Sequence, residues 1–253
     1  MPARDTKERL RAGELLYGCF VRYPDPGLAE LLALQGFDFL VLDGEHGTME
    51  PRDCENMVRG TDVRGVPALV RVPANEPAVI LRFMDTGALG VHVPLVSSAD
   101  DAERAVRAVK YGPRGTRGLT GVRAAAYGQR ESLAEYVERA NAETLVVVQI
   151  ETRAALEQVA EIAAVDGVDV VFVGPTDLSH SLGVPGQTSH PVVVEAYGAI
   201  VEGVQGSAAA LGVLVADEAG ARAWRERGAR YIAVTVDSLV TRSARGLLAA
   251  VRE

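Results

Sequence analysis

Short apolar runs recur along the chain, and each ends near Gly, Pro or Asp and is followed by a stretch with helical periodicity. Most of these runs are nearly continuous Val, Leu, Ile and Phe, which is typical of parallel strands that are covered on both faces. The pattern predicts eight strands, at Leu16–Val21, Phe37–Asp43, Ala68–Val72, Gly90–Val96, Leu145–Glu151, Val168–Gly174, Gly212–Ala216 and Tyr231–Asp237.

The segments between these runs carry helix signals. Residues 98–109 begin with a Ser cap, have acidic residues in the first turn and place apolar residues at helical spacing. Thr152–Ala163 is similar, and Asp217–Gly228 ends in a basic turn and a glycine. Eight strand–helix units predict an α/β fold, a (β/α)8 TIM barrel formed as one domain by residues 1–253. A doubly wound open sheet fits less well, because no Gly-x-Gly-x-x-Gly follows the first run.

Composition and charge narrow the classes of function. The 253-residue chain is 48% hydrophobic and 24% charged, as in an ordinary globular protein. Its formal net charge of −8 argues against nucleic-acid binding, because no basic excess is present to neutralise phosphates. Only two cysteines occur, Cys19 and Cys54, which indicates a reducing compartment. The N-terminus has no apolar signal core and no run is long enough to span a bilayer, so we expect a cytoplasmic protein.

The carboxyl ends of the strands are where a TIM barrel gathers its chemistry. Six predicted strands deliver ionisable residues to that rim: Asp43, Glu45 and His46, then Arg71, Glu151, Asp177, Asp217 and Asp237. A carboxylate in such a position often only caps the next helix, and this interpretation stays open for Asp217 and Asp237. Glutamate is a poor cap, so Glu151 is a stronger candidate for chemistry.

Glu151 and Asp177 come from neighbouring strands and suit a hard divalent cation, since Mg²⁺ often takes one or two carboxylates plus water and substrate oxygens. The absence of a thiolate favours Mg²⁺, Mn²⁺ or Co²⁺ over structural zinc. His46 lies in a Gly-Glu-His-Gly turn and suits a general base, although a capping or packing histidine fits the same context. The guanidinium of Arg71 offers a permanent positive charge and paired N–H donors for an enolate or carboxylate oxygen.

The positions of the lysines argue against Schiff-base catalysis. A Schiff-base aldolase needs a lysine at a strand end, but the only lysines are Lys7, before the first strand, and Lys110, in or after a helix. No P-loop, Gly-x-Ser-x-Gly turn or Cys-x-x-Cys pair occurs in the sequence. The longest connection, residues 97–144, contains the loop-like stretch Tyr111-Gly-Pro-Arg-Gly-Thr-Arg-Gly, and such an excursion usually carries function.

Seven short motifs, in order along almost the whole chain, are specific in combination. They are Asp43-Gly-Glu-His46, Val-Arg71-Val-Pro, Met84-Asp85-Thr-Gly-Ala, Val93-Pro94-Leu-Val, Tyr111 with Gly-Thr-Arg117-Gly, Gln149-Ile-Glu151 and Gly174-Pro-Thr-Asp177-Leu-Ser. Together they closely resemble the HpcH/HpaI aldolase family of metal-dependent pyruvate aldolases. The resemblance implies a barrel of the phosphoenolpyruvate/pyruvate-domain type. It also implies reversible cleavage of a 4-hydroxy-2-oxo acid to pyruvate and an aldehyde, through a metal-bound pyruvate enolate.

The family pattern assigns the central catalytic roles. It makes Glu151 and Asp177 the ligands of a divalent cation, which would be Mg²⁺, Mn²⁺ or Co²⁺. It makes His46, oriented by Asp43, part of the proton-transfer dyad. Arg71 would bind the pyruvate oxygen and stabilise the enolate.

The same pattern also describes the substrate pocket. Gln149 would lie beside the bound 2-oxo acid, and backbone N–H groups around Gly174, Thr176 and Asp177 would hold its carboxylate. Leu214 matches an apolar position that lines the aldehyde side.

A neighbouring subunit is part of the expectation. Asp85, a further catalytic candidate, and Arg123, a substrate-binding one, match positions near the mouth, where another subunit helps to close the site. Members of the family are typically hexamers, trimers of dimers with exchanged C-terminal helices. We therefore expect a homo-oligomer that acts on small molecules and binds neither nucleic acid nor membrane.

The sequence departs from the family pattern at four places. Arg22 replaces a smaller residue near the end of the first strand, and either meets a distal carboxylate of the substrate or is a solvated charge. Gly112 replaces a proline, His92 an aliphatic residue and Thr235 a glycine. None of the four is a predicted metal ligand, so we expect the choice of substrate to be affected and not the activity itself.

Other reactions fit the same residues. Relatives of this architecture decarboxylate oxaloacetate, use the pyruvate enolate in other C–C bond formations, as macrophomate synthase does, or cleave acyl-CoA substrates like the citrate lyase β subunit. The negative chain has no obvious basic cluster for a CoA diphosphate, which disfavours the last of these. A non-catalytic binding barrel is disfavoured because His46, Arg71, Glu151 and Asp177 are all present.

Overall fold

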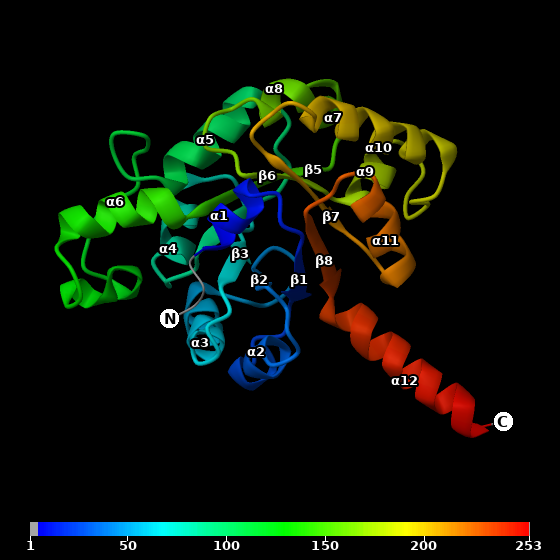
Figure 1. Cartoon of the computed structure of the whole chain (residues 1–253), viewed down its shortest axis with the longest axis horizontal. Coiled ribbons are helices and arrows are strands. Elements are labelled where there is room, and N and C mark those ends of the chain that lie inside the picture. Colours follow the sequence, from blue (N-terminus) through cyan, green and yellow to red (C-terminus); the bar gives the residue numbers. More distant parts are fainter. Residues whose placement is uncertain (1–4, 253) are drawn as a thin grey trace.

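Eight parallel strands close into a barrel in chain order, with β8 paired back to β1 (Figure 1). The computed structural model describes residues 5–252. The strands are β1 Leu16–Val21, β2 Phe39–Asp43, β3 Ala68–Arg71, β4 Gly90–Val93, β5 Leu145–Ile150, β6 Val170–Val173, β7 Ala210–Leu214 and β8 Tyr231–Thr235. The predicted TIM barrel is confirmed, and all eight predicted strands are present. β1 has the predicted bounds, and the other strands differ from the prediction by up to three residues at one or both ends.

Helices surround the barrel (Figure 1). They are α1 Thr6–Arg11, α2 Pro26–Ala33, α3 Pro51–Asp62, α4 Pro77–Met84, α5 Ala99–Val109, η1 Arg123–Gly128, α6 Leu133–Glu143, α7 Arg153–Glu157, α8 Val159–Ala163, α9 Pro175–Ser181, α10 Pro191–Val204, α11 Glu218–Glu226 and α12 Val236–Arg252. The predicted Ser cap is confirmed, because Oγ of Ser98 accepts from the N–H of Asp101. The helix predicted over 152–163 is divided at Gln158, whose φ of −120° is not helical. Within residues 5–252, no helix combines the length and the apolar character needed to cross a bilayer.

The last strand is shorter than predicted. β8 ends at Thr235, and α12 begins at once with Val236, so Asp237 lies in a first helical turn and not in the strand. The Oγ1 of Thr235 accepts from the backbone N–H of Ser238 at 3.1 Å. This local bond favours the start of a helix at a position where apolar residues alone predict more strand.

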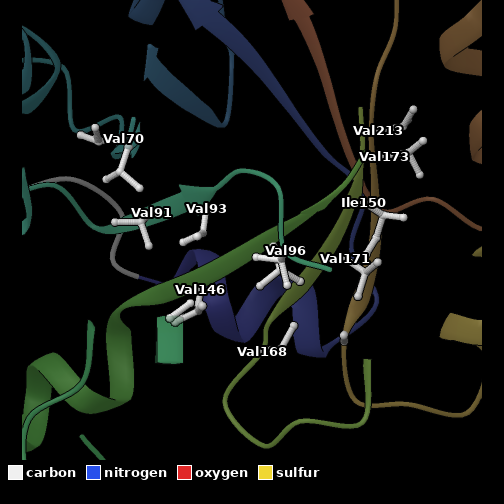
Figure 2. Packing of buried hydrophobic residues seen from close by; sticks show 14 of the residues in the cluster. Val70, Val91, Val93, Val96, Val146, Ile150, Val168, Val171, Val173 and Val213 are labelled. Atoms are coloured by element: carbon white, nitrogen blue, oxygen red, sulfur yellow. The ribbon is translucent and has the colours of Figure 1, made fainter. Parts of the chain in front are cut away.

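Alternate residues of each strand face two different cores. In β5, Val146, Val148 and Ile150 pack outward against the helices, and Figure 2 shows Val146 and Ile150 among the valines of neighbouring strands. Leu145 and Val147 face the barrel interior with Phe20, Phe39, Phe172 and Tyr231. The period of two therefore places Gln149 on the inner side, where it can serve a site at the rim.

The C-terminal helix α12 extends away from the barrel (Figure 1). Its first residue, Val236, is buried, but large apolar side chains farther along are exposed. They are Val240 at 61%, Leu247 at 66%, Leu248 at 42% and Val251 at 67%. The helix thus presents an apolar surface that its own barrel does not cover.

Candidate active site

A buried ion pair joins the ends of β2 and β3. Asp43 and Arg71 are register partners, and Nε and Nη2 of Arg71 donate to the two carboxylate oxygens at 2.9 and 2.6 Å. Nη1 lies 3.3 Å from a carboxylate oxygen of Glu45, and the guanidinium lies over the ring of Phe20, 5.2 Å from its centroid. The Arg71 side chain is only 11% exposed, so its orientation is fixed before any ligand arrives.

Asp43 also shapes the turn that carries His46. Its Oδ1 accepts from the backbone N–H of Glu45 at 3.2 Å and from that of His46 at 3.1 Å. The carboxylate is already engaged by Arg71, so Asp43 orients His46 through the backbone and not through the imidazole. The side chain of His46 is exposed at the rim, where it can exchange protons with a ligand.

Glu151 is a deeply buried carboxylate directly after β5, with an exposure of 3%. Its Oε2 accepts from the backbone N–H of Leu95 at 3.0 Å, and its Oε1 accepts from Nε2 of Gln149. A Cβ at Gly174 would lie 2.6 Å from Oε1, so only a glycine lets the end of β6 approach this closely. Three separate segments of the chain therefore set the position of one carboxylate.

The charges around Glu151 favour a cation. Burial raises the pKa of Glu151 to about 7 against the effect of the Leu95 hydrogen bond, and the charges of Glu45 and Asp177 raise it further. Burial also raises the pKa of Glu45, against the effect of Arg71. Asp177 is half-buried in the first turn of α9, so negative charge collects here with little solvent to screen it.

This oxygen-only donor set fits a hard divalent cation. Among residues 5–252, no three His, Cys, Asp or Glu side chains are arranged to hold a metal. A cation between Glu151 and Asp177 would therefore take most of its ligands from water and substrate, as Mg²⁺ commonly does.

A cavity of about 590 Å³ adjoins this cluster at the ends of β6, β7 and β8, and Leu214, Thr176 and Thr235 line it. Arg22 also lines it, with Nε 3.1 Å from a carboxylate oxygen of Asp237. The wall combines apolar side chains with hydroxyls and the guanidinium groups of Arg22 and Arg227, which suits a polar organic group.

Residues 16–244 match the model of the HpcH/HpaI aldolase/citrate lyase family. The chain belongs to this family. As a member of the HpcH/HpaI family with aldolases among its relatives, the protein is an enzyme of the aldolase type, a carbon–carbon lyase.

Relatives in the HpcH/HpaI family match over nearly the full length. The chain is 40% identical to a hydroxypyruvate/pyruvate aldolase of Sagittula stellata, covering 96% of both chains. It is 38% identical to a 5-keto-4-deoxy-D-glucarate aldolase of Shigella boydii, covering 96% of this chain and 94% of the relative. A crystal structure of an HpcH/HpaI aldolase/citrate lyase family protein from Burkholderia cenocepacia has a TM-score of 0.93 at 38% identity, covering 99% and 100%.

Two residues indicated by the HpcH/HpaI pattern do not join Glu151 within one chain. Asp85 follows α4 and accepts from Arg117 at 2.8 Å. Arg123 donates to the carbonyl of Thr86 at 2.7 Å and to Asp62 at 2.5 Å. These contacts of Asp85 and Arg123 lie near the start of β4, whereas Glu151 follows the carboxyl end of β5. Within one barrel, Asp85 and Arg123 therefore lie at the end opposite to Glu151.

Sequence reasoning missed Leu95, which contributes a backbone N–H and not a side chain to the site. Its φ of 54° is left-handed, and a leucine in the sequence gives no indication of this conformation. The Val-Pro-Leu-Val motif marked the segment but gave no chemical reason for it. The helix-cap interpretation of Asp217 is confirmed, because its side chain accepts from the N–H of Gly220 at 2.8 Å.

Proposed function

We propose that the protein is a divalent-metal-dependent aldolase that reversibly cleaves a 4-hydroxy-2-oxo acid to pyruvate and an aldehyde. The observation that carries this proposal is the pairing of two features at one rim. A buried carboxylate, Glu151, lies with Asp177 in a region of excess negative charge, and the guanidinium of Arg71 is held nearby in a fixed orientation. The aldolase names of the relatives agree with it.

Glu151 and Asp177 would hold the cation, which we propose to be Mg²⁺, Mn²⁺ or Co²⁺. When bound, it would supply Lewis-acid chemistry to the carbonyl of the 2-oxo acid. The first-turn amides of Thr176 and Asp177 have no intrahelical acceptor, and next to Gly174 they can receive the substrate carboxylate. Gln149 would position the 2-oxo acid from the inner side of the barrel.

Arg71 would stabilise the enolate oxygen. A guanidinium has five N–H donors, and Asp43 takes only two of them, so donors remain for the substrate. Because Asp43 and Phe20 fix the group, little reorganisation is needed when charge develops on the oxygen.

His46 would move the proton. In cleavage it takes the proton of the 4-hydroxyl group, and in condensation it returns that proton to the aldehyde oxygen. Its turn is held by Asp43, while the exposed imidazole can reach a ligand. The aldehyde would occupy the cavity lined by Leu214, where Arg22 and Thr235 can affect the choice of substrate.

We further propose that residues 1–253 form one barrel domain and that the protein is a homo-oligomer with exchanged C-terminal helices. The exposed apolar side chains of α12 support this proposal, since a second copy would cover them. A neighbouring copy could also bring Asp85 and Arg123 to the mouth of the site. We expect the double variant Leu247→Asp/Val251→Asp to dissociate in light scattering, and a monomeric wild-type protein would contradict the assembly.

Proton exchange in D₂O tests the proposed activity without knowledge of the aldehyde. Protein, pyruvate and Mg²⁺, Mn²⁺ or Co²⁺ are mixed, and the methyl proton signal of pyruvate is followed by NMR with and without EDTA. We expect metal-dependent loss of the signal in the wild type and in Glu161→Gln, a surface control, but not in Glu151→Gln. No exchange with any cation would contradict the proposal. Release of CO₂ from oxaloacetate without any aldol cleavage would identify a decarboxylase instead.

A further inference from the structure

His92 is a buried polar side chain among aromatic rings inside the barrel. It is 0% exposed and is the register partner of Arg71 on β4. The rings of Phe20 and Phe172 contact it edge-on, with centroids at 5.2 and 5.0 Å. Its Nε2 lies 2.8 Å from the hydroxyl of Tyr231 on β8. Burying a polar side chain such as that of His92 in an apolar layer is unfavourable unless its nitrogen atoms have hydrogen-bond partners.

The imidazole is neutral and has one donor and one acceptor. Burial, together with the charge of Arg71, lowers the pKa of His92 well below 6.5. Burial raises the pKa of Tyr231, so the phenol keeps its proton. Within residues 5–252 this hydroxyl has no hydrogen-bond partner other than His92. The phenol satisfies its donor only by donating to Nε2, which leaves the imidazole proton on Nδ1.

Nδ1 of His92 and Oε1 of Gln149 are both among the buried side-chain atoms of the described residues that have no hydrogen-bond partner. One is a donor and the other is an acceptor. The two side chains lie on the inner side of neighbouring strands, since His92 pairs with Val147, two residues before Gln149. Phe172, whose ring contacts His92, is the register partner of Gln149. Each atom is thus of the type that the other lacks. The amide nitrogen of Gln149 is already used, because it donates to Oε1 of Glu151.

We propose that His92 is a positioning residue for Glu151, acting through Gln149. Tyr231 fixes the tautomer of His92, the Nδ1–H of His92 holds Oε1 of Gln149, and Nε2 of Gln149 then donates to Glu151. A rotated amide would turn its oxygen toward the carboxylate and repel it, so the chain of bonds selects one orientation. That this orientation prepares Glu151 to bind a metal rests on the proposed function.

The tautomer is measured first, on the metal-free protein. The chain has four histidines, so ¹⁵N-histidine labelling gives few signals, and His92→Phe assigns the one of interest. We expect ¹⁵N NMR to show a proton on Nδ1 of His92, and a mixture of tautomers in Tyr231→Phe. A proton on Nε2 in the wild type would overturn the proposal, whether or not the enzyme is an aldolase.

The second measurement separates positioning from packing. In His92→Phe/Tyr231→Phe both partners of one bond become apolar and only Oε1 of Gln149 loses its donor, so we expect a folded protein with a moderately lower melting temperature. We expect this variant to bind Mn²⁺ about 10–100-fold more weakly, with a matching loss of pyruvate proton exchange. His92→Asn keeps a donor toward Gln149 and should recover most of the Mn²⁺ affinity.

Wild-type Mn²⁺ affinity in the double variant would overturn the proposal. If the double variant does not fold, the tautomer measurement on the wild type and Tyr231→Phe still decides. A wild type that has the Nδ1 proton but binds no Mn²⁺ would instead count against the proposed function.

Discussion

The backbone N–H of Leu95 donates to the buried carboxylate of Glu151 at 3.0 Å, and Leu95 does so with a φ of 54°. A left-handed conformation is unfavourable for a leucine. The side chain is 59% exposed, so packing within the chain offsets little of this strain. Strain that persists beside a carboxylate with a raised pKa is consistent with a backbone held in place for its function.

Substitutions of Leu95 should separate backbone from side chain. Leu95→Gly keeps the N–H and accepts the positive φ, so we expect unchanged Mn²⁺ affinity and a change of about 1 kcal/mol or less in unfolding free energy. Leu95→Pro removes the N–H and forbids the positive φ, so Mn²⁺ affinity should fall clearly. Calorimetric titration measures both affinities, and equal affinities in the two variants would show that the bond to Glu151 is unimportant.

Gly174→Ala should damage the site through Glu151. The added Cβ would lie 2.6 Å from Oε1 and from Cγ of the glutamate, which must then move. We expect loss of most Mn²⁺ affinity and of pyruvate exchange. The matched control is Gly198→Ala in α10, where a Cβ meets nothing within 4 Å. That variant should be more stable by about 0.5–1 kcal/mol, because alanine favours a helix. Full activity of Gly174→Ala would mean that Glu151 tolerates displacement.

Most of the fold could be predicted from the sequence because buried parallel strands leave a strong local signal. β1 was predicted at its observed ends, Leu16–Val21, and the charged residues Glu14 and Arg22 lie close to the two ends of this apolar run. The C-terminal end predicted for β8 and the continuous helix predicted over 152–163 were wrong for a common reason. Apolar residues mark burial, but a hydroxyl bond such as that of Thr235, or a single non-helical φ, decides where an element stops.

The side chains of the site could be predicted from the sequence, but the hydrogen bonds and contacts between them could not. Strand ends indicated Asp43, Arg71 and Glu151, because a barrel brings such ends together. The bond from Leu95 depends on backbone angles, and the placement of His92 and Gln149 on the inner side of neighbouring strands depends on the register of the barrel. Neither leaves a periodic pattern in the sequence. His92 stood out only as a departure from the family pattern.

Arg71→Lys should lose rate although it keeps the charge. A lysine cannot make the two parallel bonds to Asp43, and its ammonium would not be held at a developing oxyanion. We expect proton exchange of pyruvate to fall by about 10²–10³-fold, the usual effect of losing one such donor. Arg64→Lys, at the exposed ion pair with Glu30, is the control and should keep full activity. Similar rates in both variants would remove Arg71 from the mechanism.

The two lysines of the chain meet at the end of the barrel opposite to Glu151. Nζ of Lys110 donates to the carbonyl and hydroxyl oxygens of Thr144 at 2.7 and 2.8 Å, and Nζ of Lys7 reaches the same carbonyl at 3.3 Å. Lys110 is 3% exposed. Burial, and after it the charge of Lys7, lowers the pKa of Lys110 from 10.5 to about 7. A group shifted in this direction links stability to pH.

Stability should therefore rise with pH above neutrality. Between pH about 7 and 10.5 the unfolded chain keeps a proton on Lys110 that the native state has released, so raising the pH favours the native state. One such proton contributes at most about 1.4 kcal/mol per pH unit. Urea unfolding at several pH values and one protein concentration measures the slope, and Lys110→Met should lack this contribution. Equal slopes for the wild type and Lys110→Met would show that Lys110 stays charged in the folded protein.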